Sequence, residues 1–212
     1  MKWKLGMCIA ASLAALLVAK QASAAADLTL NADLITSNSA LGPQIESQLS
    51  VEVMDVGTGA QFTFINAGPL ASSITDVYWG GPGPSPLNFS MVTLPTNWTA
   101  GAAPPGLPGA NTFAVLYSAD SDSPVQPNGV QVNESIVFTI AYASGSNLAS
   151  LINALNGGQL QVGFHVQGLS DGESESYLTT PGEMVPVPAP LGLAAVGFAL
   201  VALRRRKTSS KA

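Results

Sequence analysis

The chain has 212 residues and a formal net charge of −5, but its charges are segregated along the sequence. All eight lysines and arginines lie within residues 2–20 or 204–211, whereas all thirteen acids lie within residues 27–183, which therefore carry a formal charge of −13. A region without cations forms no side-chain salt bridges of its own, and its charge excludes nucleic acid and anionic lipid headgroups as favoured partners.

The N-terminus has the three parts of a secretory signal peptide. Two lysines precede an apolar run at residues 5–19, and small residues with Ala22 and Ala24 at the cleavage positions follow. This layout predicts export through the Sec machinery, with residues 1–24 removed as the signal peptide. The alternative is an uncleaved N-terminal anchor. Cleavage after Ala24 removes Cys8, so the mature chain has no disulfide and no cysteine-based metal site.

The region after the signal peptide alternates between apolar and polar residues, the period of half-buried strands. A turn signal at residues 57–59 joins two of these segments into a predicted hairpin. Gly- and Pro-rich stretches at residues 80–86 and 96–111 predict loops, as do the polar stretches at 37–44 and 118–128. The predicted strands are 28–34, 49–56, 61–66, 73–79, 87–94 and 112–117.

The second half of this region adds strands around one helix. Residues 130–142 are long enough for two paired strands, or for one strand bent at Asn133. Residues 148–155 predict a helix capped by Ser146 or Asn147 and ended by the glycines that follow Asn156. The last predicted strands are 159–167 and 174–179.

The end of the chain reads as a membrane segment. Prolines mark an extended entry, an apolar run covers residues 191–203, and cations then stop it. As a helix, residues 185–203 would measure about 28 Å, close to the roughly 30 Å of a hydrocarbon core. The entry motif is Val185, Pro186, Val187, Pro188 and Ala189, and the stop cluster is Arg204, Arg205, Arg206 and Lys207.

Many short strands with Gly, Pro and Asn turns indicate an all-β fold. We expect residues 25–183 to form one secreted acidic domain, an antiparallel β-sandwich of jelly-roll or immunoglobulin-like type with one short helix. The signal peptide precedes this domain, and residues 184–212 follow it as the membrane segment.

One motif and one histidine raise the question of catalysis. Residues 168–172 match Gly-x-Ser-x-Gly around Ser170. The motif begins three residues after His165, the only histidine. A hydrolase elbow needs a helix after the serine, but a strand pattern follows here. We therefore interpret the motif as a hairpin turn with Asp171 and Gly172 at its tip, and His165 as a structural histidine. A secreted hydrolase stays the least favoured alternative.

Two acidic clusters are candidates for a weak calcium site, because carboxylate oxygens are the ligands that Ca²⁺ prefers. The first holds Asp120 and Asp122, and the second holds Asp171, Glu173 and Glu175. The alternative is that these acids serve solubility alone. No other cofactor is predicted.

Four aromatic residues have two interpretations. We expect Tyr78, Trp79, Trp98 and Tyr117 to belong to the core, as large aromatic side chains usually do. Alternatively they stack on sugars, with Tyr78 and Trp79 as the best patch, and extracellular polysaccharide is then a partner.

The tail resembles the PEP-CTERM sorting signals of Gram-negative bacteria, in a Val-Pro-x-Pro-Ala variant with Val187 where glutamate is usual. Residues 67–79, and residues 163–168 followed by 174–177, also resemble segments of some proteins that carry such signals. The resemblance implies anchoring in the inner membrane, processing by an exosortase, and display at the cell surface or outside the cell. It implies no catalytic residue. We therefore expect a non-enzymatic protein with a structural or adhesive role, or alternatively a carbohydrate- or calcium-binding surface module.

Overall fold

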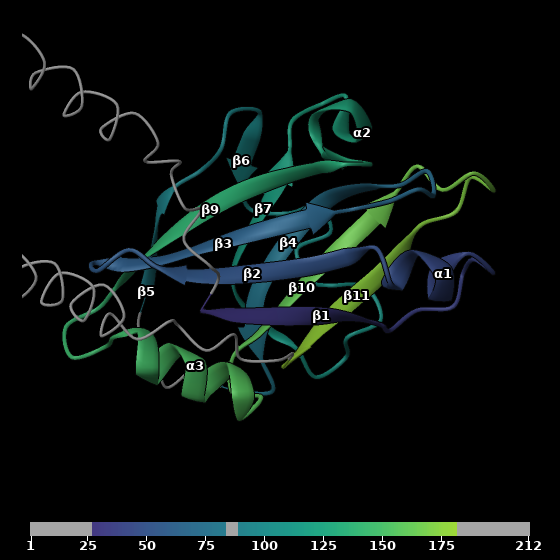
Figure 1. The fold of residues 1–212 in the computed structure, drawn as a ribbon. Coiled ribbons are helices and arrows are strands. Elements are labelled where there is room, and N and C mark those ends of the chain that lie inside the picture. Colours follow the sequence, from purple (N-terminus) through teal and green to yellow (C-terminus); the bar gives the residue numbers. More distant parts are fainter. Residues whose placement is uncertain (1–26, 84–88, 182–212) are drawn as a thin grey trace, which may run out of the picture.

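The computed structural model describes residues 27–83 and 89–181 (Figure 1). The predicted signal peptide, with its cleavage positions Ala22 and Ala24, lies outside these residues. So do the Pro-x-Pro motif, the apolar run and the arginine cluster of the tail. In the part of the chain that is described, no helix is long and apolar enough to cross a membrane.

The described residues form eleven strands and three short helices. The strands are β1 (Leu28–Leu34), β2 (Leu49–Asp55), β3 (Gly59–Asn66), β4 (Ser73–Gly81), β5 (Phe89–Thr93), β6 (Trp98–Ala100), β7 (Ala114–Ser121), β8 (Val130–Gln131), β9 (Glu134–Tyr142), β10 (Gln161–Gln167) and β11 (Glu175–Pro181). The helices are α1 (Gly42–Glu46), α2 (Val125–Asn128) and α3 (Leu148–Asn156).

All the strands belong to one antiparallel sheet that curls into a half-barrel (Figure 1). Its order is β5-β9-β3-β2-β1-β11-β10-β4-β7-β6, with β8 paired to β4 off this path. The predicted antiparallel all-β class is therefore confirmed. The predicted sandwich holds only roughly, because the core lies between two halves of one curled sheet and not between two separate sheets.

The core fills the concave side of the sheet with aromatic rings. Phe64 lies at its centre, with its ring 5.6 Å from Trp79, 5.4 Å from Phe138 and 6.0 Å from Phe164, all edge to face. These side chains come from β3, β4, β9 and β10, so the cluster joins distant parts of the sheet. Aromatic rings packed edge to face add stability beyond the burial of their area.

The helices agree only partly with the sequence pattern. The predicted helix is α3, where the Asn147 side chain accepts a hydrogen bond from the Ser150 backbone N–H and Ser150 bonds back to Asn147. Helix α2 lies in a predicted loop, and α1 begins in one and extends two residues beyond it. Helices of five and four residues are too short to show a 3.6-residue pattern, so they leave no signal in the sequence.

The strand predicted at residues 130–142 is interrupted. β8 and β9 are separated by Val132 and Asn133, and Asn133 has a φ of 64°. Each half then pairs with a different strand, β8 with β4 and β9 with β3. The kink predicted near Asn133 is confirmed, and neither a hairpin nor one bent strand describes the result fully.

Residues 101–110, here called the cover loop, lie over the outer face of the sheet. The Tyr78 hydroxyl of β4 donates to the Pro104 carbonyl at 3.0 Å, and Leu107 is buried against Gly163 of β10. Every residue of β4 is buried as a result, because the core covers one face and the cover loop the other. The loop predicted at residues 96–111 thus contains β6 and this cover.

Candidate functional site

A row of polar side chains crosses the outer face of the sheet beside the cover loop. Ser176 of β11 stands opposite His165 of β10, which stands opposite Asp76 of β4, and Asp76 stands opposite Asp120 of β7. Residues directly opposite in antiparallel strands point to the same face with Cβ atoms about 5 Å apart. The register therefore places four hydrogen-bonding side chains in one line.

Asp76 is the most buried carboxyl group of this row, with 1% of its surface exposed. The Thr75 hydroxyl donates to its Oδ2 at 2.9 Å, whereas no donor group of the described residues bonds its Oδ1. Burial, with a smaller contribution from the neighbouring Asp120, raises the pKa of Asp76 to about 7. Burial also raises the pKa of Asp120.

His165 lies between this carboxyl group and an open pocket. Its Nδ1 lies 3.1 Å from the Ser176 hydroxyl oxygen. Burial lowers the pKa of His165, and the negative charge of Glu175 opposes this only in part. The imidazole is therefore neutral at pH 7, with one nitrogen engaged by Ser176. The interpretation of His165 as a structural histidine is consistent with this contact.

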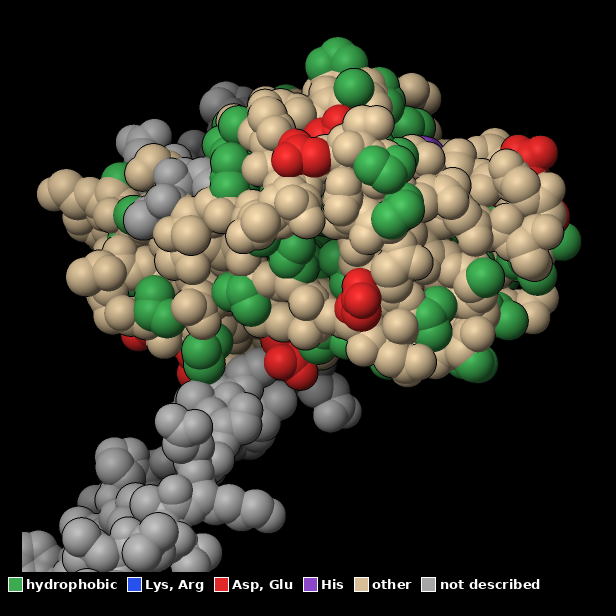
Figure 2. Space-filling view, turned by 90° about the horizontal axis from the view of Figure 1, so that it is seen from above, with side chains coloured by type: hydrophobic (Ala, Val, Ile, Leu, Met, Phe, Trp, Pro, Cys, Tyr) green, Lys and Arg blue, Asp and Glu red, His purple; other side chains and the backbone are tan. Residues whose placement is uncertain are grey.

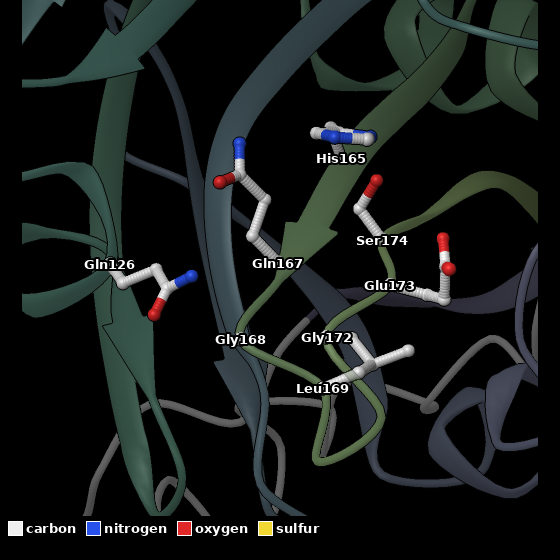
Figure 3. A pocket seen from close by; sticks show the side chains of 8 residues that line it. All are labelled: Gln126, His165, Gln167, Gly168, Leu169, Gly172, Glu173 and Ser174. Atoms are coloured by element: carbon white, nitrogen blue, oxygen red, sulfur yellow. The ribbon is translucent and has the colours of Figure 1, made fainter.

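The pocket next to His165 has a volume of about 570 Å³ (Figure 3). Strand β10, helix α2 and the turn before β11 supply its walls. Gly168 lets the Gln126 side chain approach, because a Cβ at this glycine would lie only 3.3 Å from that amide. The lining residues are Gln126, His165, Gln167, Gly168, Leu169, Gly172, Glu173 and Ser174.

The chemistry of this lining suits an uncharged ligand with many hydroxyl groups. The amides of Gln126 and Gln167 offer donors and acceptors, Glu173 offers an acceptor, and Ser174 offers both. Residues 27–183 contain no lysine or arginine, so no cationic side chain of this region is available for an anionic ligand. On the face shown in Figure 2, acidic side chains are scattered among neutral ones.

The arrangement does not resemble a hydrolase nucleophile site. Ser170 lies in the turn of a hairpin between β10 and β11, so a strand follows it where an elbow requires a helix. The hairpin interpretation of the Gly-x-Ser-x-Gly motif is confirmed, but the Gly172 N–H donates to the Leu169 carbonyl at 2.9 Å, so Ser170 and Asp171 form the tip and not Asp171 and Gly172. Ser176 does contact the imidazole, but its side chain is fully buried and is closed to a substrate.

In the first predicted calcium cluster, Asp120 lies in strand β7 and Asp122 lies in the loop that follows it. Asp120 belongs to the polar row of β7, and Asp122 just beyond it accepts a hydrogen bond from the Thr99 hydroxyl at 2.6 Å. Their carboxylates therefore face different partners. The extension of β7 to Ser121 explains the difference from the predicted loop.

The second cluster surrounds Ser39. Asp171 accepts from the Ser39 hydroxyl, and Glu175 accepts from the Ser39 backbone N–H. Glu173 lies on the turn, where its backbone N–H donates to Asp171 Oδ1 at 3.1 Å. Across residues 27–83 and 89–181, no group of three or more His, Cys, Asp and Glu side chains is arranged to hold a metal ion. Calcium binding stays a prediction.

Three of the four aromatic residues pack in or against the core. Tyr78 and Trp79 are fully buried and Trp98 is nearly so, while Tyr117 packs against Trp79 with ring centroids 6.0 Å apart. The expectation of core aromatics is confirmed for Trp79, Trp98 and Tyr117, whereas Tyr78 is buried on the opposite face, under the cover loop. Tyr78 and Trp79 offer no exposed ring on which a sugar could stack.

Two residues of the site escaped the sequence analysis. Asp76 left a weak signal, a carboxylate inside an otherwise uncharged strand pattern. Gln126 left none, because a glutamine in a polar loop is unremarkable. Comparisons with protein-family models, with curated proteins and with solved structures found no match. The site is therefore interpreted from its own geometry and chemistry.

Proposed function

We propose that this chain is an exported, surface-sorted, non-enzymatic protein with a structural or adhesive role in the envelope or extracellular matrix. Its C-terminal helix anchors it transiently in the inner membrane, and an exosortase then processes it. The tail supports this proposal through its Pro-x-Pro motif, apolar run and cluster of cations. The signal peptide pattern supports it too, as does the region between them, which has no lysine, arginine or cysteine.

The position at which the last described strand ends is the structural observation that supports this proposal most. β11 ends at Pro181, before the Pro-x-Pro motif at Pro186 and Pro188. Because β11 pairs with both β1 and β10, it is an integral part of the sheet. A cut near Pro188 would therefore leave every strand of the described residues on the released β domain.

Mass spectrometry of the mature C-terminus tests this proposal. The full chain is expressed in a host with an exosortase and in the same host without it. We expect a truncated C-terminus near Pro188 only when the enzyme is present, and a membrane-bound full-length tail when it is absent. Replacing Arg204–Lys207 by serines is the matched variant, and it should prevent retention and processing. An intact tail in both hosts would contradict processing.

A second candidate function is recognition of neutral saccharide by the pocket beside His165. The observation in its favour is the polar lining, which combines amide, carboxylate, hydroxyl and neutral imidazole groups around about 570 Å³. Saccharides are bound through such groups, and protein pockets for small ligands fall in this size range. This proposal specifies how an adhesive role would work.

A glycan array with the full chain tests this second candidate. We expect binding to neutral glycans, with loss in Gln126→Ala and Gln167→Ala. Thr63→Ala on the outer face of β3 is the control, since it lies outside the pocket. Binding that survives both pocket variants would place the ligand elsewhere, and an array without binding would remove the saccharide proposal.

We propose a weak calcium site as a third candidate, at the turn that bears Asp171, Glu173 and Glu175. Thermal melting in millimolar CaCl₂ and in chelator would detect it, because a ligand of the native state raises the melting temperature. An Asp171→Asn variant should lose the shift. Equal melting temperatures in both solutions would rule this site out.

A further inference from the structure

Asp76 of β4 and Asp120 of β7 face each other under the cover loop. We infer that these two carboxyl groups hold one proton between them at neutral pH, and that loss of this proton loosens the cover loop. The inference is independent of the proposed sorting and binding functions. It concerns a pH-sensitive device built into the domain.

The hydrogen bonds of Asp76 require a proton. Its Oδ2 receives the Thr75 hydroxyl, but its Oδ1 is buried with no donor of the described residues in reach. The side chain of Asp120 lies within bonding reach of Asp76. Two carboxylates are both acceptors, so they bond only when one of them is protonated. A shared proton therefore lets the two carboxyl groups bond to each other instead of repelling.

No cation in the surroundings can replace this proton. On β10, His165 is held neutral by burial, and on β4 the Tyr78 hydroxyl is occupied by Pro104. Just beyond β7, Asp122 adds another negative charge. Neither the cover loop nor α2 contains a titratable side chain, and residues 27–183 contain no lysine or arginine. Two facing carboxylates would therefore repel each other without compensation.

The cover loop separates the Asp76 and Asp120 carboxyl groups from solvent. The Ala102 N–H of the loop donates to the Ser118 hydroxyl of β7 at 3.0 Å, and the backbone of Ala103 lies close to the Asp76 carboxyl group, whose pKa it lowers. When the shared proton leaves, the second negative charge needs water, and water reaches Asp76 only if the cover loop moves. Opening of the loop is therefore the expected response to alkaline pH.

The direction of the pH effect follows from the raised pKa. The folded state holds the Asp76 proton up to about pH 7, whereas the unfolded chain releases it near 3.8. The native state thus binds more protons within this window, so its stability falls as pH rises from about 4 to about 7. His165 acts in the opposite direction below pH 6.5, because burial lowers its pKa. Variants must separate the two effects.

The test compares the full chain with Asp76→Asn, Asp120→Asn and Asp33→Asn, the last an exposed aspartate on β1. The folding equilibrium constant is measured by denaturant unfolding at pH 5 and pH 8. We expect the folding equilibrium constant of Asp76→Asn, divided by that of the parent chain, to increase ~10-fold or more from pH 5 to pH 8. Asp120→Asn should show a smaller increase, and Asp33→Asn should follow the parent chain.

Two direct readouts accompany this comparison. Infrared spectroscopy of the parent chain at pH 6 should show one protonated carboxyl group, absent in Asp76→Asn. Amide hydrogen exchange at Ala102 and Ala103, corrected for the intrinsic effect of pH, should be faster at pH 8 than at pH 5 in the parent chain alone. A parent chain without the carboxyl band, or with the same pH dependence as Asp76→Asn, would overturn the shared proton. Unchanged exchange in the cover loop would overturn its opening.

Discussion

Glu175 of β11 accepts a hydrogen bond from the backbone N–H of Ser39, although 136 positions separate the two residues in the chain. The Thr36 hydroxyl donates to the same carboxylate, and the Glu175 side chain is fully buried. The last strand thus fixes the segment between β1 and α1. In a region without lysine or arginine, hydrogen bonds from backbone and hydroxyl groups stabilise this buried carboxylate.

We predict that Glu175→Gln destabilises the domain by about 1–3 kcal/mol, the cost of leaving a buried donor without its acceptor. The amide keeps the shape of the side chain but replaces one acceptor oxygen by an NH₂ group that faces a donor. Urea unfolding measures the loss. Glu52→Gln, an exposed glutamate on β2, is the control and should change the free energy of unfolding by less than about 0.5 kcal/mol. Equal losses in both variants would contradict this role.

A second buried network joins the turn before β2 to strands β3 and β8. The Gln48 amide donates to Asn66 Oδ1 at 2.9 Å and to the Ser72 hydroxyl at 2.8 Å, while the Asn66 amide donates to the Val130 carbonyl at 3.2 Å. Asn66→Ala should cost about 2–4 kcal/mol, because it leaves these buried groups unpaired and opens a small cavity. Ser135→Ala, an exposed residue opposite Ile65, should cost little. A mild effect at Asn66 would mean that water replaces the network.

His165 predicts a separate pH effect. Because burial lowers its pKa, the unfolded chain takes up a proton before the folded chain does as pH falls below 6.5. Stability is therefore lost below pH 6.5, and His165→Gln should abolish this part of the loss. As the only histidine in the chain, it gives one unambiguous NMR titration when no histidine tag is present. A measured pKa above 6.5 would contradict the effect of burial.

Local patterns predicted much of this fold. The alternation at residues 28–34 corresponds to β1, the turn at 57–59 joins β2 and β3, and Asn147 caps α3 as its position suggested. Each of these features depends on neighbours a few residues apart. The hairpin at residues 168–172 was predictable for the same reason, since the pattern of the next strand follows it directly.

Long-range register was beyond such patterns. Asp76 alternates with apolar residues in a way that predicts an exposed outer face, yet the cover loop buries it. Nothing in the Gly- and Pro-rich stretch indicated that it would lie back on β4 and β10. Likewise, one curled sheet and two packed sheets need the same strands, and only the pairing of β1 with β11 distinguishes them. These contacts form between segments far apart in sequence.

The contact between Gly163 and Leu107 gives a test of the cover loop that does not depend on pH. A Cβ at Gly163 would lie 2.3 Å from Leu107 Cδ2, much closer than atoms tolerate, but the clash is with a side chain and not with backbone. Gly163→Ala should therefore cost about 1–3 kcal/mol through overpacking. Leu107→Ala alone should cost about 2 kcal/mol or more through the cavity it leaves.

The two changes should compensate each other in a double-mutant cycle. In Gly163→Ala with Leu107→Ala, the methyl group enters the space that the leucine leaves, so the combined loss should be smaller than the sum by about 1 kcal/mol or more. Gly59→Ala is the matched control, since its Cβ would lie 1.9 Å from the backbone oxygen of Ile140. Leu107→Ala cannot relieve that clash, so this pair should be additive. Additivity in both cycles would mean that the cover loop does not rest on β10.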